Sequence, residues 1–303
     1  MKQFTSQIKR SKVLLCMLIP ALAYVILFCY IPMTGVSLAF KNFKYALGIF
    51  KSPWCGWDNF RYLFVTGKIW SLTRNTLLYN IAFIFLGLLF EVGFAILLSE
   101  INNKLFKKIA QGFMFLPYFI SWVVVATVML NIFGSNGVLN SILAHFGVTD
   151  FSIYKQVKQW PIVLVLVRVG KQTGYGTVVY LAAIAGIGKD LYEAASIDGA
   201  SVWQKIRYIT LPSLKPTIMI MVLLALGNVF RGDFGMFYQL VGSNQLLLNS
   251  SDILDTYIYR MLTTSPNVGL TAAAGLYQSI LCFVTILTAN WIVKKIDPEY
   301  TLF

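Results

Sequence analysis

Four polar residues interrupt an apolar stretch of the chain between residues 161 and 187. Arg168, Lys171, Gln172 and Tyr175 have the spacing of a single helical face. A polar stripe on an apolar helix should line a cavity, where these groups could hold a polar solute such as a sugar. The alternative is that Arg168 and Lys171 reach lipid phosphates at the membrane boundary. At 1.5 Å per residue, Arg168 would lie about 10 Å deep, which favours the cavity.

A second polar group follows the apolar run 216–230. Asn228, Arg231 and Tyr238, together with Asp233, could continue the same pathway or form an outer lid. The stripe and this group carry more positive than negative charge. That excess favours an acidic sugar such as a uronate oligomer.

Glu91 is a third candidate, because it interrupts the apolar run 77–98. A charge at the membrane midplane costs about 2.5–3.5 kcal/mol, so this side chain should face protein or water. A position nearer the inner edge would lower that cost. A structural polar contact and a role in the pathway or its gating both remain open.

Residues suited to covalent catalysis or ATP hydrolysis are not evident. Gly188-Lys189 is followed by Asp190 and lacks the spacing of a phosphate-binding loop. The single histidine, His145, argues against a histidine triad or a multi-histidine metal site. The four cysteines have no metal-ligand spacing. We therefore expect no catalytic residue, metal site or cofactor in this chain, and a membrane enzyme is disfavoured.

The elements that position these residues are expected to be membrane helices. The 303 residues are 57% hydrophobic and 12% charged, with a mean hydropathy of +0.70. Soluble domains are roughly 45–50% apolar and about 25% charged. The sequence therefore predicts an all-α polytopic membrane protein with six transmembrane helices. The six apolar runs are 13–40, 77–98, 109–133, 161–187, 216–230 and 269–293.

The first run follows a basic segment and contains Ala21-Leu22-Ala23, which could be a signal-peptide cleavage site. Because the apolar stretch continues through residues 24–28, we expect a retained span instead.

Basic residues predict the orientation of the spans. The inner segments, taken as 1–12, 99–108, 188–215 and 294–303, hold 13 basic residues, and the longer outer segments 41–76, 134–160 and 231–268 hold ten. The higher density inside favours two cytoplasmic termini, although the six basic residues in 41–76 weaken the argument. We expect a cytoplasmic segment 1–12, a transmembrane domain 13–293 and a cytoplasmic tail 294–303.

The inner segment 188–215 reads as two short helices broken at Gly199, since Ala194 and Ala195 favour a helix and glycine does not. The second helix should present one apolar face, and two prolines should end it where the chain returns to lipid. Trp203, Ile206 and Ile209 form that face, and Pro212 and Pro216 follow. Such an amphipathic elbow suits docking into a groove on a partner protein.

This segment resembles the "EAA" loop of ATP-binding-cassette (ABC) importer permeases. The family pattern is Glu-Ala-Ala, three residues, Gly, nine residues, then Ile-x-Leu-Pro. Its fixed positions are filled by Glu193, Ala194, Ala195, Gly199, Ile209, Leu211 and Pro212, and Asp198 precedes the glycine. The resemblance assigns these eight residues to the coupling of the permease to its ATPase.

Other segments resemble the branch of the family that imports large or complex saccharides. They are 52–60, 74–76, 234–238, 255–260 and the closing 300–303, so the likeness covers nearly the whole chain. Cys55 stands where the branch usually has a small apolar residue.

The resemblance implies a permease of the bacterial plasma membrane that performs no chemistry. Its expected partners are a second, usually different permease, two ATPase subunits that bind ATP and Mg, an extracellular binding protein and an oligosaccharide. An ABC permease for another solute is the near alternative. An ion-coupled secondary transporter is a more distant one, since Glu91 is the one acid at membrane depth and no inverted repeat is evident.

Overall fold

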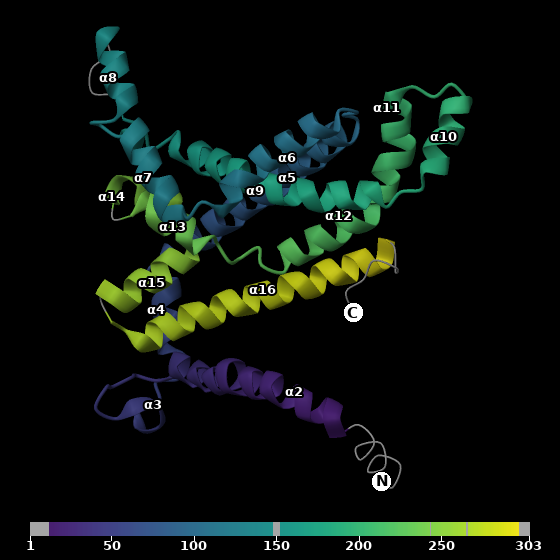
Figure 1. Cartoon of the computed structure of the whole chain (residues 1–303). Helices are drawn as coiled ribbons and strands as arrows, with labels where there is room; N and C mark the ends of the chain where they lie inside the picture. The colour runs from purple at the N-terminus through teal and green to yellow at the C-terminus, as the bar shows by residue number, and fades with distance from the viewer. Residues whose placement is uncertain (1–11, 148–151, 243, 265, 297–303) are drawn as a thin grey trace. The chain divides into compact units, whose positions relative to one another are not determined.

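The computed structural model describes residues 12–147, 152–242, 244–264 and 266–296 (Figure 1). All regular secondary structure in these ranges is helical, and one isolated β-bridge joins Lys41 to Trp54. The chain forms two compact units. One is drawn from Met1–Gly67 and Ile258–Tyr277, and the other from Lys68–Tyr257 and Gln278–Phe303. The predicted segments 1–12 and 294–303 lie outside the described residues, apart from 12 and 294–296.

The first unit begins with one apolar helix that changes its winding twice. Its elements are α2 (Lys12–Val25), the π-helix η1 (Ile26–Tyr30), the 3₁₀-helix η2 (Ile31–Phe40), α3 (Gly48–Lys51) and α4 (Asp58–Val65). Lys41, the residue that follows η2 in the chain, is buried. Its Nζ donates to the carbonyls of Ile49 at 2.8 Å and Phe50 at 3.0 Å. One of the six basic residues that weaken the predicted orientation therefore has a structural role.

The second unit contains the elements that carry the candidate residues. They are α5 (Lys68–Ser99), α6 (Lys104–Phe119), α7 (Trp122–Phe133), α8 (Val138–His145), η3 (Ile153–Lys155), α9 (Trp160–Ala185), α10 (Lys189–Ile197), α11 (Val202–Lys205), the π-helix η4 (Ile206–Thr210), α12 (Leu211–Leu226), α13 (Phe234–Val241) and α14 (Gln245–Ser251). Helices α15 (Leu254–Thr264) and α16 (Val268–Ile296) each belong in part to both units.

Five helices among the described residues are long and apolar enough to cross a membrane. They are Cys16–Phe40, Lys68–Ser99, Trp122–Ala144, Val202–Leu226 and Val268–Lys295. Helix α9, which the sequence predicted as the fourth span, is not among them, because its polar residues lower its mean hydropathy. The predicted third span, 109–133, is divided between α6 and α7, where the Ser121 side chain caps α7 by accepting the Val124 N–H at 3.3 Å.

The expectation that Pro212 and Pro216 end the elbow's second helix is wrong. Helix α11 continues through η4 into α12 as one helix, Val202–Leu226. The N–H of Leu211 donates to the carbonyl of Ile206, five residues back. This wider π turn makes room for a proline ring that would otherwise collide with the carbonyl four residues before it. Pro32 likewise follows the π turn η1 by two residues.

Helix α9 packs against both α5 and α6, and two glycines permit its close approach. A Cβ at Gly174 would collide with the main chain of Met114 in α6, and one at Gly176 would collide with the Glu91 side chain in α5. Lipid supplies no hydrophobic drive between membrane helices, so close packing of small residues must hold them together. The contact also brings Glu91 into the same lining as Arg168 and Gln172 of α9.

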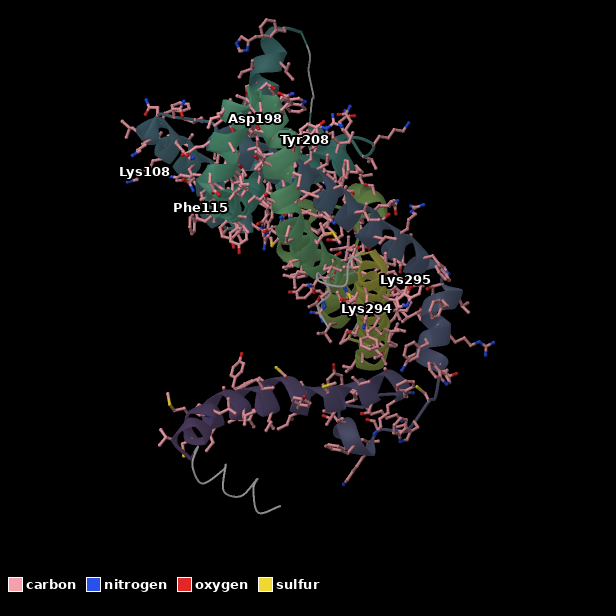
Figure 2. All side chains as sticks on the ribbon, turned by 90° about the vertical axis from the view of Figure 1, so that its right-hand side faces the viewer. Lys108, Phe115, Asp198, Tyr208, Lys294 and Lys295 are labelled. Carbon is pink, nitrogen blue, oxygen red and sulfur yellow. The ribbon has the colours of Figure 1, made fainter. Side chains whose placement is uncertain are left out.

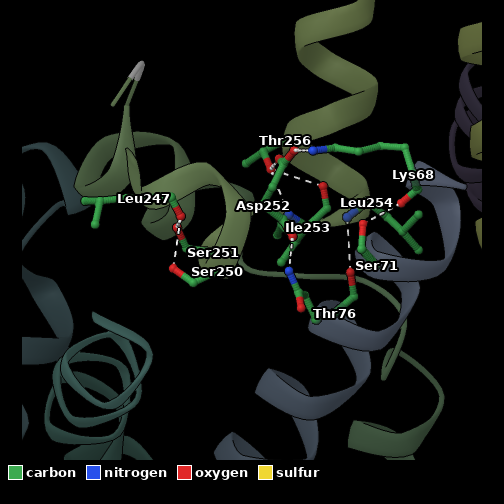
Figure 3. A network of polar contacts seen from close by, with 11 residues as sticks. Lys68, Ser71, Thr76, Leu247, Ser250, Ser251, Asp252, Ile253, Leu254 and Thr256 are labelled. Carbon is green, nitrogen blue, oxygen red and sulfur yellow. Dashed lines mark hydrogen bonds and ion pairs between the residues drawn. The ribbon is translucent and has the colours of Figure 1, made fainter. Parts of the chain in front are cut away.

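Two of the sequence segments used for the family resemblance meet in one hydrogen-bond network (Figure 3). Thr76 Oγ1 accepts the Leu254 N–H at 3.1 Å, and the Asn75 amide donates to the Asp252 carbonyl at 3.2 Å. Thr256 Oγ1 donates to the Asp252 carboxylate at 2.9 Å. The start of α5 is thereby joined to the turn between α14 and α15.

The described parts of three predicted inner segments lie at one end of the second unit. The α5–α6 connection, the α10–α11 pair and the end of α16 share this end (Figure 1). Figure 2 views it face on, with Lys108, Asp198 and Lys294 labelled. Lys108 of α6 and Lys294 and Lys295 of α16 are therefore found at the same end of the unit (Figure 2).

Gly174→Ala should destabilise the protein, because the added Cβ would strike the main chain of α6. Overpacking of this kind costs about 1–3 kcal/mol. Gly170→Ala is the matched control, one turn earlier on the same helix, since nothing lies within 4 Å of a Cβ at Gly170. Thermal unfolding in detergent should show a lower midpoint for Gly174→Ala alone. Equal midpoints for the two variants would contradict this account of the helix contact.

Candidate functional site

A cavity of about 440 Å³ lies in the second unit between α5, α9, α12 and the turn that follows α12. Its lining combines apolar side chains with a small set of polar and charged ones. The polar and charged members are Asn80, Glu91, Arg168, Gln172, Tyr180, Asn228, Arg231 and Asp233. Sites for small polar ligands are commonly built this way, with a few polar groups that fix orientation.

Four of the seven residues predicted for a pathway line this cavity. They are Arg168, Gln172, Asn228 and Arg231. Glu91 and Asp233, which the sequence also singled out, line it as well. The spacing of 168 and 172 along α9 therefore places one half of the stripe against the cavity.

The other half of the stripe faces α6. Lys171 is 9% exposed, and its Nζ donates to the Tyr118 carbonyl at 2.8 Å, in the last turn of α6. The Tyr175 ring stacks on Tyr118 with the ring centres 4.9 Å apart. Lys171 thus satisfies a carbonyl left free where α6 ends, and neither it nor Tyr175 lines the cavity. Tyr238, the last of the seven, lies on α13 and stacks on Phe234 at 5.2 Å.

Arg168 and Asp233 form an ion pair within the cavity lining. Arg168 Nε lies 3.1 Å from Asp233 Oδ2. The Phe83 ring centre is 5.6 Å from the guanidinium carbon, so an aromatic face covers part of this cation. Asp233 also caps α13, because its Oδ1 accepts the Met236 N–H at 3.2 Å.

Charges of opposite sign are balanced in the cavity lining. Arg168 and Arg231 are its basic members, and Glu91 and Asp233 its acidic ones. The positive excess expected from the sequence counted Lys171, which the structure turns toward α6, and left out Glu91, which the structure places in the lining. Net charge therefore does not by itself indicate an acidic ligand.

The turn that carries Arg231 and Asp233 is held by two side chains from distant segments. Asp255 Oδ2 accepts the Gly232 N–H at 2.7 Å and the Gln278 amide at 3.0 Å. The same Gln278 amide donates to the Phe230 carbonyl at 2.7 Å. Because α12 ends at Leu226, these bonds replace the helical bonds that the turn lacks.

Asn80 and Phe83 were not predicted, although both line the cavity from α5. A signal for Asn80 was present in the sequence. Residues 80, 84, 87 and 91 fall on one helical face, so the face that carries Glu91 also carries Asn80. Nothing in the spacing distinguishes Phe83 from the other aromatic residues of this span.

The predicted elbow is a pair of helices, α10 and α11, joined by a tight turn. Gly199 has φ of 78°, and the N–H of Ala200 donates to the Ala195 carbonyl at 2.8 Å. The N–H of Gly199 donates to the Ser196 carbonyl at 3.2 Å, which completes a Schellman motif. Ser201 and Gln204 then form a capping box that starts α11. The left-handed conformation explains why this position carries glycine.

Polar contacts hold the two elbow helices together and leave their apolar side chains outward. Lys205 Nζ donates to Ser196 Oγ at 2.7 Å, and the hydroxyls of Tyr192 and Thr210 are 3.0 Å apart. Several large side chains remain exposed, including Ile197 at 87% and Trp203 at 70%. The other predicted coupling residues lie on the same segment, with Glu193, Ala194 and Asp198 exposed, Ala195 and Ile209 half-buried, and Leu211 and Pro212 at the start of α12.

In the part of the chain that the structure describes, no three His, Cys, Asp or Glu side chains are grouped so that they could hold a metal ion.

Sequence comparison places the chain near membrane transport proteins. The sequence model described as "Binding-protein-dependent transport system inner membrane component" matches residues 84–298. Protein LplB of Bacillus subtilis (strain 168) is 33% identical over 293 residues, which cover 96% of this chain and 92% of that protein. The polygalacturonan/rhamnogalacturonan transport system permease protein YteP of the same strain is 30% identical over 303 residues, covering 98% and 92%.

Comparison with solved structures also finds chains of membrane transporters. A chain in the crystal structure of a bacterial ABC transporter involved in the import of the acidic polysaccharide alginate aligns with a TM-score of 0.88. It is 30% identical, and the alignment covers 97% of this chain and 99% of that one. A chain of the bacterial alginate ABC transporter in complex with an alginate pentasaccharide-bound periplasmic protein aligns with a TM-score of 0.86 and 30% identity, covering 96% and 97%.

Asp255→Ala should destabilise the protein by about 1–3 kcal/mol, because the Gly232 and Gln278 donors lose their acceptor. Asp255→Asn is the matched control, since an amide oxygen can accept both bonds.

A pH series compares the Asn variant with the unaltered protein and tests the Asp255 carboxyl itself. Burial raises the pKa of Asp255, and the hydrogen bonds from Gly232 and Gln278 lower it by less. The folded protein therefore keeps this proton to a higher pH than the unfolded chain. The group's stabilisation is complete below the unfolded pKa and is lost as pH rises through the folded pKa. Unfolding midpoints of the Asn variant should lack this slope, and an unchanged slope would show that another group causes it.

Proposed function

Because the chain belongs to the family of inner-membrane components of binding-protein-dependent transport systems, we propose that it forms half of the pathway through which an ABC importer admits oligosaccharides. The chain is a permease subunit of the plasma membrane, and a separate subunit hydrolyses ATP. The observation that carries the oligosaccharide assignment is the cavity of about 440 Å³. Its amide, hydroxyl and charged groups suit a ligand rich in hydroxyls.

The named relatives support a saccharide as cargo. One is a permease for polygalacturonan and rhamnogalacturonan, and the solved structures concern import of alginate. Arg168, Gln172, Asn228 and Arg231 are the residues we assign to the cavity wall. Lys171, Tyr175 and Tyr238 are assigned to the support of that wall, on the contacts described above.

The elbow is the proposed joint with the ATPase. Force from ATP hydrolysis in another chain must enter this one through a non-covalent contact, and the α10–α11 pair presents exposed apolar side chains for it. Glu193 is exposed on α10, where it can accept a charge-assisted hydrogen bond from the partner. The remaining EAA residues, from Ala194 to Pro212, would shape the turn and its return to the membrane.

The proposed arrangement has six spans with both termini and the elbow in the cytoplasm. The five apolar helices and α9 would supply the spans, with α6 and α7 together forming the third. Basic residues at the start of α6, on the elbow and at the end of α16 support a cytoplasmic location for this end. A second permease, usually a different chain, would complete the pathway, with two ATPase subunits and an extracellular binding protein.

Reconstitution tests the function directly. The chain should support ATP-dependent oligosaccharide uptake into proteoliposomes only when a second permease, the ATPase and the binding protein are present. Uptake driven by an ion gradient without ATP would indicate a secondary transporter. Uptake of an amino acid with no response to any saccharide would assign another solute.

Gly199→Val should release the ATPase, with about tenfold less of it co-purifying, because a β-branched residue is strained at φ of 78°. Gly199→Asn is the matched control, since asparagine tolerates this conformation. Nothing lies within 4 Å of a Cβ at Gly199, so this chain has room for either side chain. Loss with Val alone would identify the turn geometry as the requirement. Full co-purification and uptake with Val would refute the elbow as the coupling joint.

A further inference from the structure

The guanidinium of Arg168 is incompletely satisfied within the cavity. Its Nε is buried and forms no hydrogen bond with a described residue, although Asp233 Oδ2 is 3.1 Å away. The two charges attract each other without an aligned hydrogen bond. A buried donor left in this state costs free energy that a ligand or a water can recover. The guanidinium carbon lies 5.6 Å from the centre of the Phe83 ring, an apolar neighbour that accepts no conventional hydrogen bond from the Nε–H.

A carboxylate is the ligand that fits this guanidinium. The planar guanidinium matches a carboxylate with two parallel charge-assisted hydrogen bonds. A hydroxyl of a neutral sugar offers one uncharged acceptor and gains less. The sugar class that exploits Arg168 fully is therefore one that carries carboxyl groups, such as a uronate oligomer.

We propose that Arg168 recognises a carboxylate of an acidic oligosaccharide, and that Asp233 is a resident counter-ion that this carboxylate displaces. The proposal rests on the proposed function. The two oxygens of Asp233 have separate tasks, because Oδ1 caps α13 while Oδ2 faces Arg168. Asp233 can therefore lose its cation and still hold the start of α13.

This exchange of one carboxylate for another makes the cavity prefer an acidic sugar to a neutral one. In the absence of cargo, the two basic and two acidic lining residues balance, so no cation is left without a counter-charge at membrane depth. An arriving uronate replaces one carboxylate by another on Arg168, and exposed Arg231 is available to the displaced Asp233. A neutral sugar carries no carboxylate that could replace Asp233. The ion pair of Arg168 with Asp233, which joins α9 to the start of α13, therefore stays intact.

The test compares two pentasaccharide probes on the assembled importer in detergent and in proteoliposomes. One probe is galacturonate pentamer, and the other is the same pentamer with its carboxyl groups reduced to alcohols. Arg168→Gln should weaken binding of the acidic probe at least about tenfold and weaken binding of the reduced probe far less. Asp233→Asn keeps the helix cap, since asparagine caps as well as aspartate. It should tighten binding of the acidic probe about two- to fivefold.

Lys158→Gln serves as the control, because it removes an exposed cation outside the cavity. It should change neither affinity. Equal effects of Arg168→Gln on both probes, or no effect of Asp233→Asn on the acidic one, would overturn the inference while leaving saccharide import intact. Absence of binding and uptake with every saccharide tested would instead overturn the proposed function, and the inference with it.

Discussion

The close contact of α9 with α5 and α6 is the constraint on which the rest of the second unit depends. Membrane helices have no hydrophobic drive toward one another, so they associate where small residues let their surfaces come close. Gly174 admits the main chain of α6, and Gly176 admits the Glu91 side chain of α5. Because the Gly174 contact is with main-chain atoms, it fixes which side of α9 faces α6 and so decides which side chains face the cavity. Arg168 and Gln172 face it, while Lys171 lies against α6.

Interruptions of the helices are the second feature that shapes the site. In lipid every freed backbone group needs a partner within the protein. Lys171 supplies one for the end of α6, and Gln278 supplies one for the turn after α12. The turn held by Gln278 and Asp255 carries Arg231 and Asp233 to the cavity. The irregular backbone is therefore found where it serves the cavity lining, and side chains from distant segments support it.

The cavity and the elbow lie on different parts of one continuous framework. Helix α9 contributes to the cavity wall and leads directly into α10, and α11 continues through η4 into α12, which forms another part of the wall. A displacement of the elbow would therefore reach the cavity along two helices. The π turn η4 lies on one of these routes, between the elbow and the membrane portion of α12. Turns of this kind are frequent at functional sites in helices.

The sequence by itself determined the helical membrane class, most of the apolar runs, the break at Gly199 and the residue types of the polar stripe. These features depend on local composition and spacing, which need no knowledge of neighbouring helices. The spacing of residues 168, 171, 172 and 175 puts them within one half of the helix surface, but the structure divides them between the cavity and α6. Helical spacing, however, does not show which part of that surface faces α6 and which part faces the cavity.

Tertiary structure decided the rest, because it depends on contacts between segments distant in the sequence. Only the fold shows that Lys171 binds the carbonyl of Tyr118 at the end of α6 and that Asp233 pairs with Arg168. Only the fold shows, likewise, that Asp255 holds the turn that follows α12. The continuation of the elbow helix past Pro212 was likewise hidden, because a π turn leaves no pattern that spacing reveals. Charge balance in the cavity followed from the rotation of α9, which turns Lys171 toward α6, and from the packing of α5, which brings Glu91 into the lining.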